Sequence, residues 1–63
     1  MEHIRDILIY PYELSIYFKA STQYAFDIKN INDETVITEC DWGSEVEATR
    51  AGIIKFAELI NNQ

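Results

Sequence analysis

Residues 39–47, ECDWGSEVE, hold four carboxylates, a tryptophan and the single cysteine of a 63-residue chain. Side chains of these types can perform three kinds of chemistry. Acidic oxygens bind hard cations such as Ca²⁺, a thiolate acts as a nucleophile, and two carboxylates with different pKa values act as general acid and general base. Each of these chemistries requires a particular spacing and particular neighbours.

The segment does not meet any of these requirements. A calcium loop places acids at alternating positions and ends in a bidentate glutamate, whereas Glu45 and Glu47 fall at the start of a predicted helix. Cys40 would need a nearby base, and the only histidine is His3, near the other end of the chain. Paired carboxylates need a cleft, for which so small a sheet has little room. We therefore expect no catalytic residue, no metal site, no cofactor and no enzymatic activity.

The same nine residues are better explained as the junction between a strand and a helix. Ser44 followed by Glu47 matches a capping box, in which the serine oxygen accepts from the N3 amide and the glutamate reaches back to the cap amide. Acidic residues in the first helical turn also interact favourably with the helix dipole. Cys40 and Trp42 share the parity of the apolar strand positions, so both are expected to point into the core.

Length and composition predict one small domain in a reducing compartment. A domain of 63 residues buries only about 60% of the surface of its unfolded chain, so a second copy would add needed stability. One cysteine and one histidine cannot form a disulfide or a structural metal site within the chain. The longest apolar run, ILIY at 7–10, is far shorter than the roughly 20 residues of a membrane span, and no signal peptide is recognisable. We expect a cytoplasmic protein without membrane association.

The net charge of -6 is concentrated in one part of the chain. Residues 33–47 contain six acids and no lysine or arginine, whereas the rest contains five acids and five bases. Affinity for nucleic acid comes largely from basic side chains that displace counterions, so direct nucleic-acid binding is not expected. We name the six acids the acidic segment and treat them as candidate partner-binding residues: Asp33, Glu34, Glu39, Asp41, Glu45 and Glu47.

Three segments alternate between apolar and polar residues with the period of a strand: 13–20, 24–29 and 35–42. Most of their larger apolar residues stand at even positions. Antiparallel neighbours share a face, so even positions must oppose even positions, and three-residue loops at 21–23 and 31–33 satisfy this condition. A two-residue Asn-Asp turn is rejected because it would set Glu39 opposite Phe26.

From Ser44 the apolar period becomes that of a helix. Gly52 lies within the apolar stripe, where the absence of a side chain lets helix and sheet approach closely. The stripe should cover the even face of the sheet and comprises Ala48, Gly52, Ile53, Phe56, Ala57, Leu59 and Ile60. The predicted fold is α+β: a single β-β-β-α domain over residues 1–63, with a three-stranded antiparallel meander and one C-terminal helix packed on one face.

Residues 1–12 allow more than one interpretation. Ile4, Ile7 and Leu8 have the spacing of a short helix, whereas DILIYPY (6–12) equally fits a strand or an extended arm. Pro11 ends either element, because it lacks an amide proton and restricts Tyr10 to extended geometry. The strand or arm is favoured.

Some apolar residues fall outside the predicted core and indicate surfaces for a protein partner. The face of the sheet away from the helix carries Tyr17 and Ile37, and the outer side of the helix carries Ile54 among charged residues. The first and third strands of the meander are edges open to pairing with another chain, and Tyr12 lies near the first edge. The candidate interface residues are Tyr12, Tyr17, Ile37 and Ile54.

The segment EVEATRAGIIKFAELI (45–60) resembles the closing helix of small, uncharacterised bacterial and phage-encoded β-β-β-α proteins, in which an E-A-x-x-A-G-I-x-K-x-x-E-L-I pattern follows a short sheet. The resemblance implies a fold rather than an activity, and Ile54 and Phe56 lie outside the pattern. It is carried by Glu47, Ala48, Ala51, Gly52, Ile53, Lys55, Glu58, Leu59 and Ile60.

Two functions fit these expectations, and a small hydrolase is retained as a third alternative. The first is a non-enzymatic, acidic protein-binding module that forms a homodimer and comes from a phage or another mobile element. The alternative is an inhibitor of the anti-CRISPR or anti-restriction type, whose carboxylates mimic duplex phosphates and block a basic nucleic-acid-binding surface of another protein. In this alternative, Glu39 and Asp41 are expected on the face away from the helix, while Glu45 and Glu47 lie on the helix itself.

Overall fold

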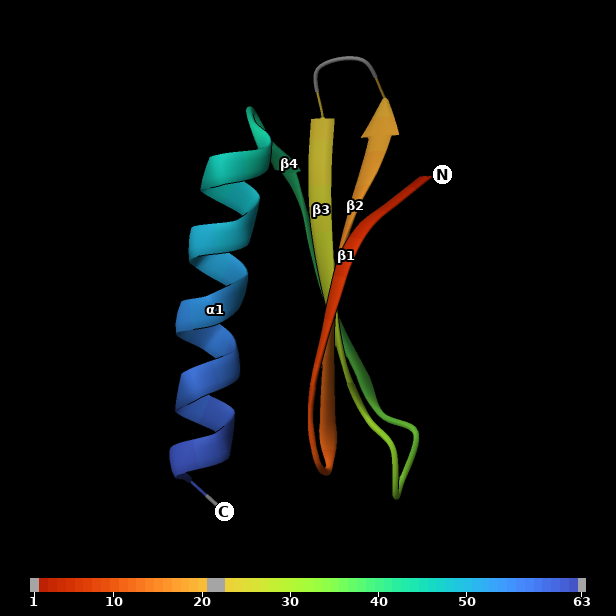
Figure 1. Cartoon of the computed structure of the whole chain (residues 1–63), viewed down its shortest axis with the longest axis vertical. Helices are drawn as coiled ribbons and strands as arrows, with labels where there is room; N and C mark the ends of the chain where they lie inside the picture. Colours follow the sequence, from red (N-terminus) through yellow and green to blue (C-terminus); the bar gives the residue numbers. More distant parts are fainter. Residues whose placement is uncertain (1, 21–22, 63) are drawn as a thin grey trace.

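The computed structural model describes residues 2–20 and 23–62 of the chain. Four strands form one antiparallel sheet in sequence order: β1 (Glu2–Ile9), β2 (Tyr12–Ala20), β3 (Gln23–Asn30) and β4 (Val36–Trp42). The helix α1 (Glu45–Asn61) follows and lies along one face, so the other face of the sheet stays open (Figure 1). The predicted α+β class, antiparallel meander and C-terminal helix are confirmed, but the sheet has four strands rather than three.

The fourth strand is formed by the N-terminal segment. β1 pairs antiparallel with β2 along its length, with an irregularity between His3 and Arg5. The chain then turns at Tyr10 and Pro11, whose peptide bond is cis, so Pro11 ends the element as expected. Because β1 pairs with β2, the first predicted strand is central, and the two edges of the sheet are β1 and β4.

β2 and β3 pair as the parity of their apolar residues predicts. Leu14 lies opposite Ile28, and Ile16 lies opposite Phe26. These four side chains are at most 2% exposed and form the core together with Ala48 and Phe56 of α1. The predicted three-residue loop at 21–23 is wrong, because Gln23 already belongs to β3 and pairs with Ala20; residues 21 and 22 lie outside the described residues.

The predicted register of β4 is wrong. Ile28 lies opposite Ile37 and Phe26 lies opposite Glu39, which is the pairing that the parity argument rejected. Residues 31–35 connect β3 to β4, so the loop is longer than predicted. Ile37 therefore lies on the helix side of the sheet, and Cys40, which was expected in the core, is exposed.

Two residues with positive φ accompany this register. Glu34, in the loop before β4, has φ 61°, and Asp41, near the end of the strand, has φ 72°. The pairing between β3 and β4 is irregular close to Asp41, so Trp42 returns to the helix side opposite Tyr24. Trp42 packs against the core, as predicted, and its ring is stacked on Phe26 with centroids 6.4 Å apart.

At Gly52, α1 approaches the sheet closely. A β-carbon built at this position would lie 3.1 Å from Leu14 Cδ1 and 3.2 Å from Phe26 Cγ, so the predicted role of the glycine is confirmed. The buried stripe of α1 is narrower than predicted, because Ile53 and Ala57 are exposed.

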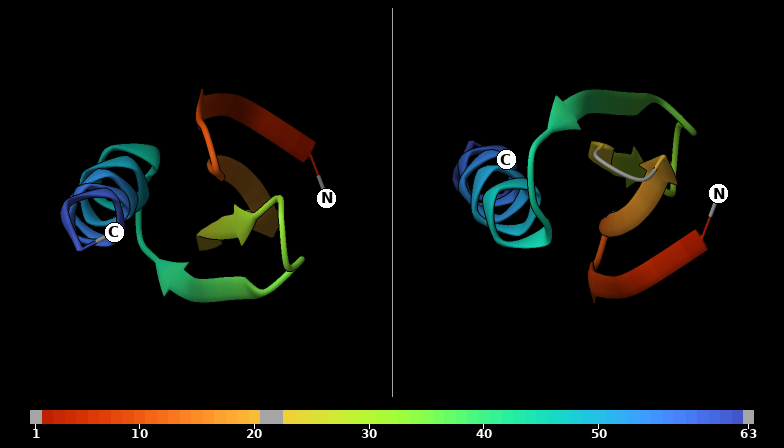
Figure 2. Two further views of the ribbon diagram at one scale, coloured as in Figure 1. Left: turned by 90° about the horizontal axis from the view of Figure 1, so that it is seen from below. Right: turned by 90° about the horizontal axis from the view of Figure 1, so that it is seen from above.

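α1 lies against β2, β3 and β4 but not against β1. Seen end-on in Figure 2, the helix sits beside one face of the twisted sheet, with β1 and β4 at the two edges. Within the described residues, the helix has neither the length nor the apolar character required to cross a membrane.

Candidate functional site

The acidic segment lies along the β4 edge of the sheet and continues into the first turn of α1. Asp33 and Glu34 precede β4, Glu39 and Asp41 lie on it, and Glu45 begins α1. β4 runs from the lower end of the molecule in Figure 1 to the upper end, where α1 starts. The structure therefore spreads the acids along one edge instead of gathering them at one point. Within the described residues, no group of three or more His, Cys, Asp or Glu side chains is arranged to hold a metal ion.

Glu39 lies on the other face from the one expected. It is directly opposite Phe26, whose side chain is buried beneath α1, so Glu39 also projects on the helix side of β4. Its side chain remains exposed because β4 is the edge strand.

The position of Asp33 is explained by hydrogen bonds within its own loop, without a partner protein. Its Oδ1 accepts hydrogen bonds from the Thr35 amide at 3.0 Å and from the Thr35 hydroxyl at 2.7 Å. The backbone and side-chain hydrogen bonds from Thr35 hold the pKa of Asp33 below its usual value of 3.8. This carboxylate therefore stabilises the loop before β4.

Glu47 and Ser44 form the helix cap in a modified version of the predicted box. Ser44 Oγ accepts from the Glu47 amide at 3.2 Å, as expected. Glu47 Oε2 accepts from the Gly43 amide at 3.3 Å rather than from the amide of Ser44. Both interactions satisfy amide groups at the start of α1, so the role of Glu47 is also local.

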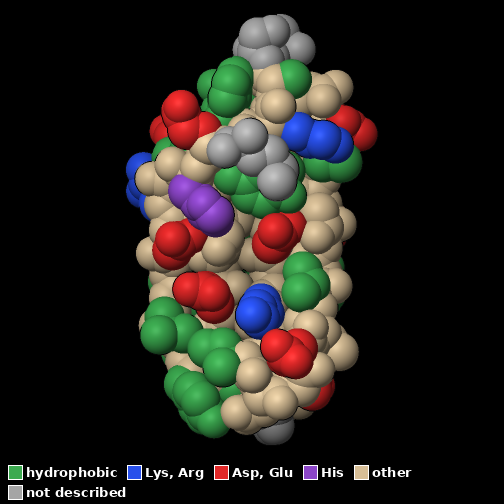
Figure 3. Space-filling view, turned by 90° about the vertical axis from the view of Figure 1, so that its right-hand side faces the viewer, with side chains coloured by type: hydrophobic (Ala, Val, Ile, Leu, Met, Phe, Trp, Pro, Cys, Tyr) green, Lys and Arg blue, Asp and Glu red, His purple; other side chains and the backbone are tan. Residues whose placement is uncertain are grey.

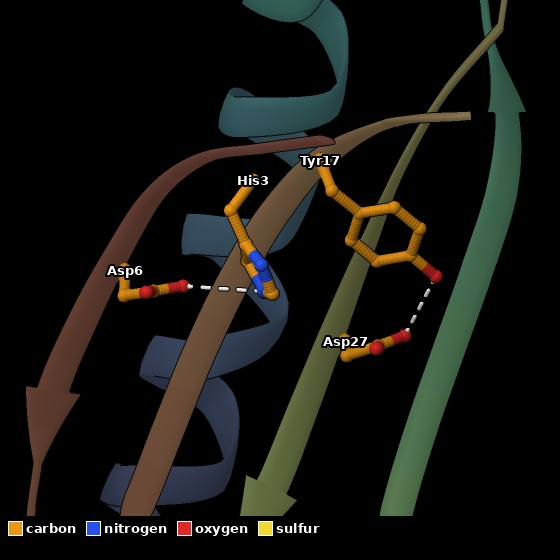
Figure 4. Close-up of polar contacts among 4 residues, drawn as sticks. All are labelled: His3, Asp6, Tyr17 and Asp27. Carbon is orange, nitrogen blue, oxygen red and sulfur yellow. Dashed lines mark hydrogen bonds and ion pairs between the residues drawn. The ribbon is translucent and has the colours of Figure 1, made fainter. Parts of the chain in front are cut away.

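A polar cluster occupies the open face of the sheet (Figure 4). The Tyr17 hydroxyl donates to Asp27 Oδ1 at 3.0 Å, and the Thr38 hydroxyl donates to the same oxygen at 2.7 Å. On β1, His3 Nε2 lies 3.8 Å from Asp6 Oδ1. We call these five residues the open-face cluster.

The open-face cluster offers hydrogen bonds but no enclosed reactive group. Burial, together with the hydrogen bond to Asp27, raises the pKa of Tyr17 above its usual value of 10.0, so the phenol is a donor and not a base at neutral pH. Asp27 Oδ1 already accepts two hydrogen bonds. The side chains of His3 and Asp6 are 68% and 51% exposed.

Figure 3 shows that charged side chains of both signs are mixed over the open face, around the single histidine. Hydrophobic side chains gather at its lower end, where β1 turns into β2. Leu8 and Tyr10 are 61% and 67% exposed there. The Tyr10 hydroxyl donates to Asn32 Oδ1 at 2.6 Å, so this turn is tied to the loop before β4.

The four candidate interface residues do not form one surface. Tyr17 is only 8% exposed and lies on the open face. Tyr12 and Ile37 are partly buried, and Tyr12 packs against the core on the helix side. Ile54 is 56% exposed on α1. Of the four, Ile54 alone lines one of the two hollows described next.

A groove of about 430 Å³ lies between β1 and α1, and its walls are mainly apolar. It exists because α1 covers β2, β3 and β4 but leaves the helix side of β1 uncovered. A second hollow, of about 310 Å³, is lined by Glu2, Ile4, Phe18, Tyr24 and Glu45. The groove is lined by Arg5, Glu45, Val46, Thr49, Arg50, Ile53 and Ile54.

The groove combines exposed aliphatic side chains with charges of both signs. Val46, Ile53 and Ile54 are 63%, 45% and 56% exposed. Among the described residues, Lys55 forms an ion pair with Glu58 and His3 lies 3.8 Å from Asp6, whereas the charged groups of the groove form no ion pair. Thr49 Oγ1 is buried and has no hydrogen-bond partner among residues 2–20 and 23–62.

Sequence reasoning missed most of the groove, although a signal was present. Val46, Ile53 and Ile54 are related by steps of seven and eight residues, which places them on one side of a helix. The buried residues Ala48, Gly52 and Phe56 define the side of α1 that faces the sheet, and Ile54, two residues or about 200° from Gly52, points away from it. The position of Arg5 in the groove could not be predicted from the sequence, because it depends on the pairing of β1 with β2.

Comparison of the chain with protein-family models, with curated proteins and with solved structures gives no match. The resemblance of residues 45–60 to phage-encoded proteins therefore stays a prediction. The function is argued below from the geometry of the groove and of the acidic edge.

Proposed function

We propose that the chain is a non-enzymatic protein-binding module that uses the groove between β1 and α1. One observation carries the proposal: three aliphatic side chains of α1 stay exposed beside a mainly apolar hollow. Removing apolar surface from water is worth about 25 cal/mol per Å², so a partner that covers these side chains gains free energy. An origin in a phage or another mobile element is part of the proposal.

The composition of the groove suits a protein partner. Aliphatic side chains line the groove together with the long side chains of Arg5 and Arg50. Arginine is enriched in protein interfaces, where it combines an apolar stem with several hydrogen-bond donors. A groove between a helix and a strand can also accept the apolar face of another helix.

Substitution of Ile54 tests the groove against a matched control. Ile54→Lys places a charge in the groove, whereas Val36→Lys changes a residue of similar exposure, 52% against 56%, on β4. The immobilised chain is incubated with bacterial lysate supplemented with purified untagged chain. We expect bound protein to be lost with Ile54→Lys and retained with Val36→Lys. Equal capture by both variants, or no capture by the unaltered chain, would refute the proposal.

A second candidate function rests on the acidic edge. None of the six acids joins an ion pair among the described residues; four of them precede or lie on β4, and two lie in the first turn of α1. Carboxylates that are free of ion pairs along one edge are the feature that an inhibitor mimicking duplex phosphates requires. Its target would be a basic nucleic-acid-binding surface of another protein.

Glu39→Gln combined with Asp41→Asn tests this alternative without altering the groove. The two amides keep the shapes of the side chains, and asparagine tolerates the positive φ of position 41. Mimicry predicts capture of a basic protein at low salt, loss of that capture at about 1 M salt, where the Debye length is about 3 Å, and weaker capture by the double variant. Capture that is unaffected by the salt concentration and by the double substitution argues against mimicry.

A further inference from the structure

We infer that the occupant of the groove is the groove of a second copy of this chain, so that two chains associate about a two-fold axis with α1 facing α1. The inference rests on the proposed function and names its partner. It is carried by the distribution of charge in the groove and by the arrangement of apolar residues on α1.

The charges of the groove are self-complementary. In a two-fold dimer the same patch of both copies meets itself, so a patch of a single sign would repel its copy. This groove holds two guanidinium groups, from Arg5 and Arg50, and one carboxylate, from Glu45, and none of them is paired within the described residues. The Glu45 carboxylate of each copy can therefore pair with an arginine of the other copy.

The apolar residues suit helix-to-helix packing. Val46, Ile53 and Ile54 form a seam along one side of α1, which is the arrangement that packs against another helix. Thr49 lies between them and is small enough to let a second helix approach.

The surface area indicates association of folded chains rather than folding on association. The accessible surface is 4170 Å², close to the roughly 4200 Å² of an ordinary folded monomer of this mass. A standard interface takes about 800 Å² from each partner, about a fifth of this surface. The surface area that lines the groove is smaller than the area of a standard interface, so we expect a reversible dimer whose population depends on concentration.

Sedimentation velocity from about 1 μM to about 1 mM measures this association directly. We expect the unaltered chain to pass from monomer to dimer over the series. Ile54→Lys should raise the dissociation constant about tenfold or more, and Val36→Lys should leave it unchanged. Circular dichroism of each variant establishes that it is folded, so a lost dimer is not confused with a lost fold.

A charge exchange identifies the partner as a second groove. The variant Arg5→Glu, Arg50→Glu has an entirely acidic groove, and Glu45→Lys has an entirely basic one. We expect each variant to be monomeric alone at concentrations where the unaltered chain is dimeric, and an equimolar mixture to form a heterodimer. Glu45→Lys also removes an acid from the first helical turn, so its thermal unfolding is measured in parallel.

Two outcomes overturn the inference. One is an unaltered chain that stays monomeric at every concentration, and the other is a mixture of the two charge variants that does not associate. A monomeric chain that still captures another protein in an Ile54-dependent manner overturns this inference alone and leaves the proposed function standing. If the unaltered chain shows no interaction that depends on Ile54, with itself or with another protein, both this inference and the proposed function are overturned.

Discussion

Gly52→Ala is the most direct test of how α1 packs on the sheet. On a solvent-exposed part of a helix this substitution stabilises the protein by about 1 kcal/mol, because alanine has the higher helix propensity. At Gly52 the added β-carbon would lie 3.1 Å from Leu14 Cδ1 and 3.2 Å from Phe26 Cγ. Neighbouring atoms must move by a few tenths of an ångström to accept it.

The expected magnitude follows from two opposing contributions. Overpacking of a well-packed core costs about 1–3 kcal/mol, which exceeds the gain of about 1 kcal/mol in helix propensity. The net effect should be a destabilisation of up to about 2 kcal/mol. A 63-residue domain has a total stability of about 3–9 kcal/mol, so this loss is a substantial fraction of it.

Leu14→Val supplies the control, because it removes Cδ1, the atom nearest to the new β-carbon. In that background Gly52→Ala should cost less stability than in the unaltered chain, so the effects of the two substitutions should not add. Urea unfolding followed by the fluorescence of Trp42, which stacks on Phe26, reports the core directly, with circular dichroism as a second probe. Protein concentration is held constant, since association adds to apparent stability. A stabilising Gly52→Ala in the unaltered chain would refute the close approach.

Three further predictions follow from single contacts. Ser44→Ala removes the oxygen that accepts from the Glu47 amide and should cost about 1 kcal/mol, which is a fall of about 4–8 °C in Tm; an unchanged Tm would mean that the cap contributes nothing. The raised pKa of Tyr17 means that the folded chain holds the phenolic proton more tightly than the unfolded chain. This contribution to stability is complete below pH 10.0 and is lost as the pH rises above it, so the free energy of unfolding of Tyr17→Phe should fall less over that range; equal slopes would contradict the assignment. Exposed Cys40 should react with a thiol reagent in the folded chain at a rate close to that in urea, and protection in the folded chain would restore the buried position that its parity suggested.

The parts of the fold that the sequence predicts correctly are those whose signal is local and strong. Leu14 and Ile16 alternate with polar residues, and Phe26 and Ile28 do the same on the next strand, so one register buries all four. The position of Ser44 before α1 is likewise a local signal, since a capping serine acts on an amide three residues away.

β4 could not be assigned in this way because both of its faces carry apolar residues. Val36 and Trp42 stand at even positions and Ile37 at an odd one, so alternation favours neither face decisively. The observed register also needs left-handed conformations at Glu34 and Asp41, which non-glycine residues adopt uncommonly. Glu39 was assigned to the wrong face for the same reason.

A strand or arm was favoured for residues 1–12, but its pairing with the sheet was not predicted, and the groove was missed as a consequence. A helix is about 10–12 Å across and neighbouring strands lie about 4.8 Å apart, so one helix covers two or three strands. A three-stranded sheet would therefore be covered, whereas a four-stranded sheet must leave part of its helix side open.

The connection between β4 and α1 determines which strand is left uncovered. Gly43 and Ser44 alone separate the two elements, so α1 is held close to the β4 edge of the sheet. The uncovered strand must then be β1, at the opposite edge. Once residues 2–9 pair with β2, an open groove between β1 and α1 follows from the dimensions of the chain, and the aliphatic residues on that side of α1 are left for a partner to cover.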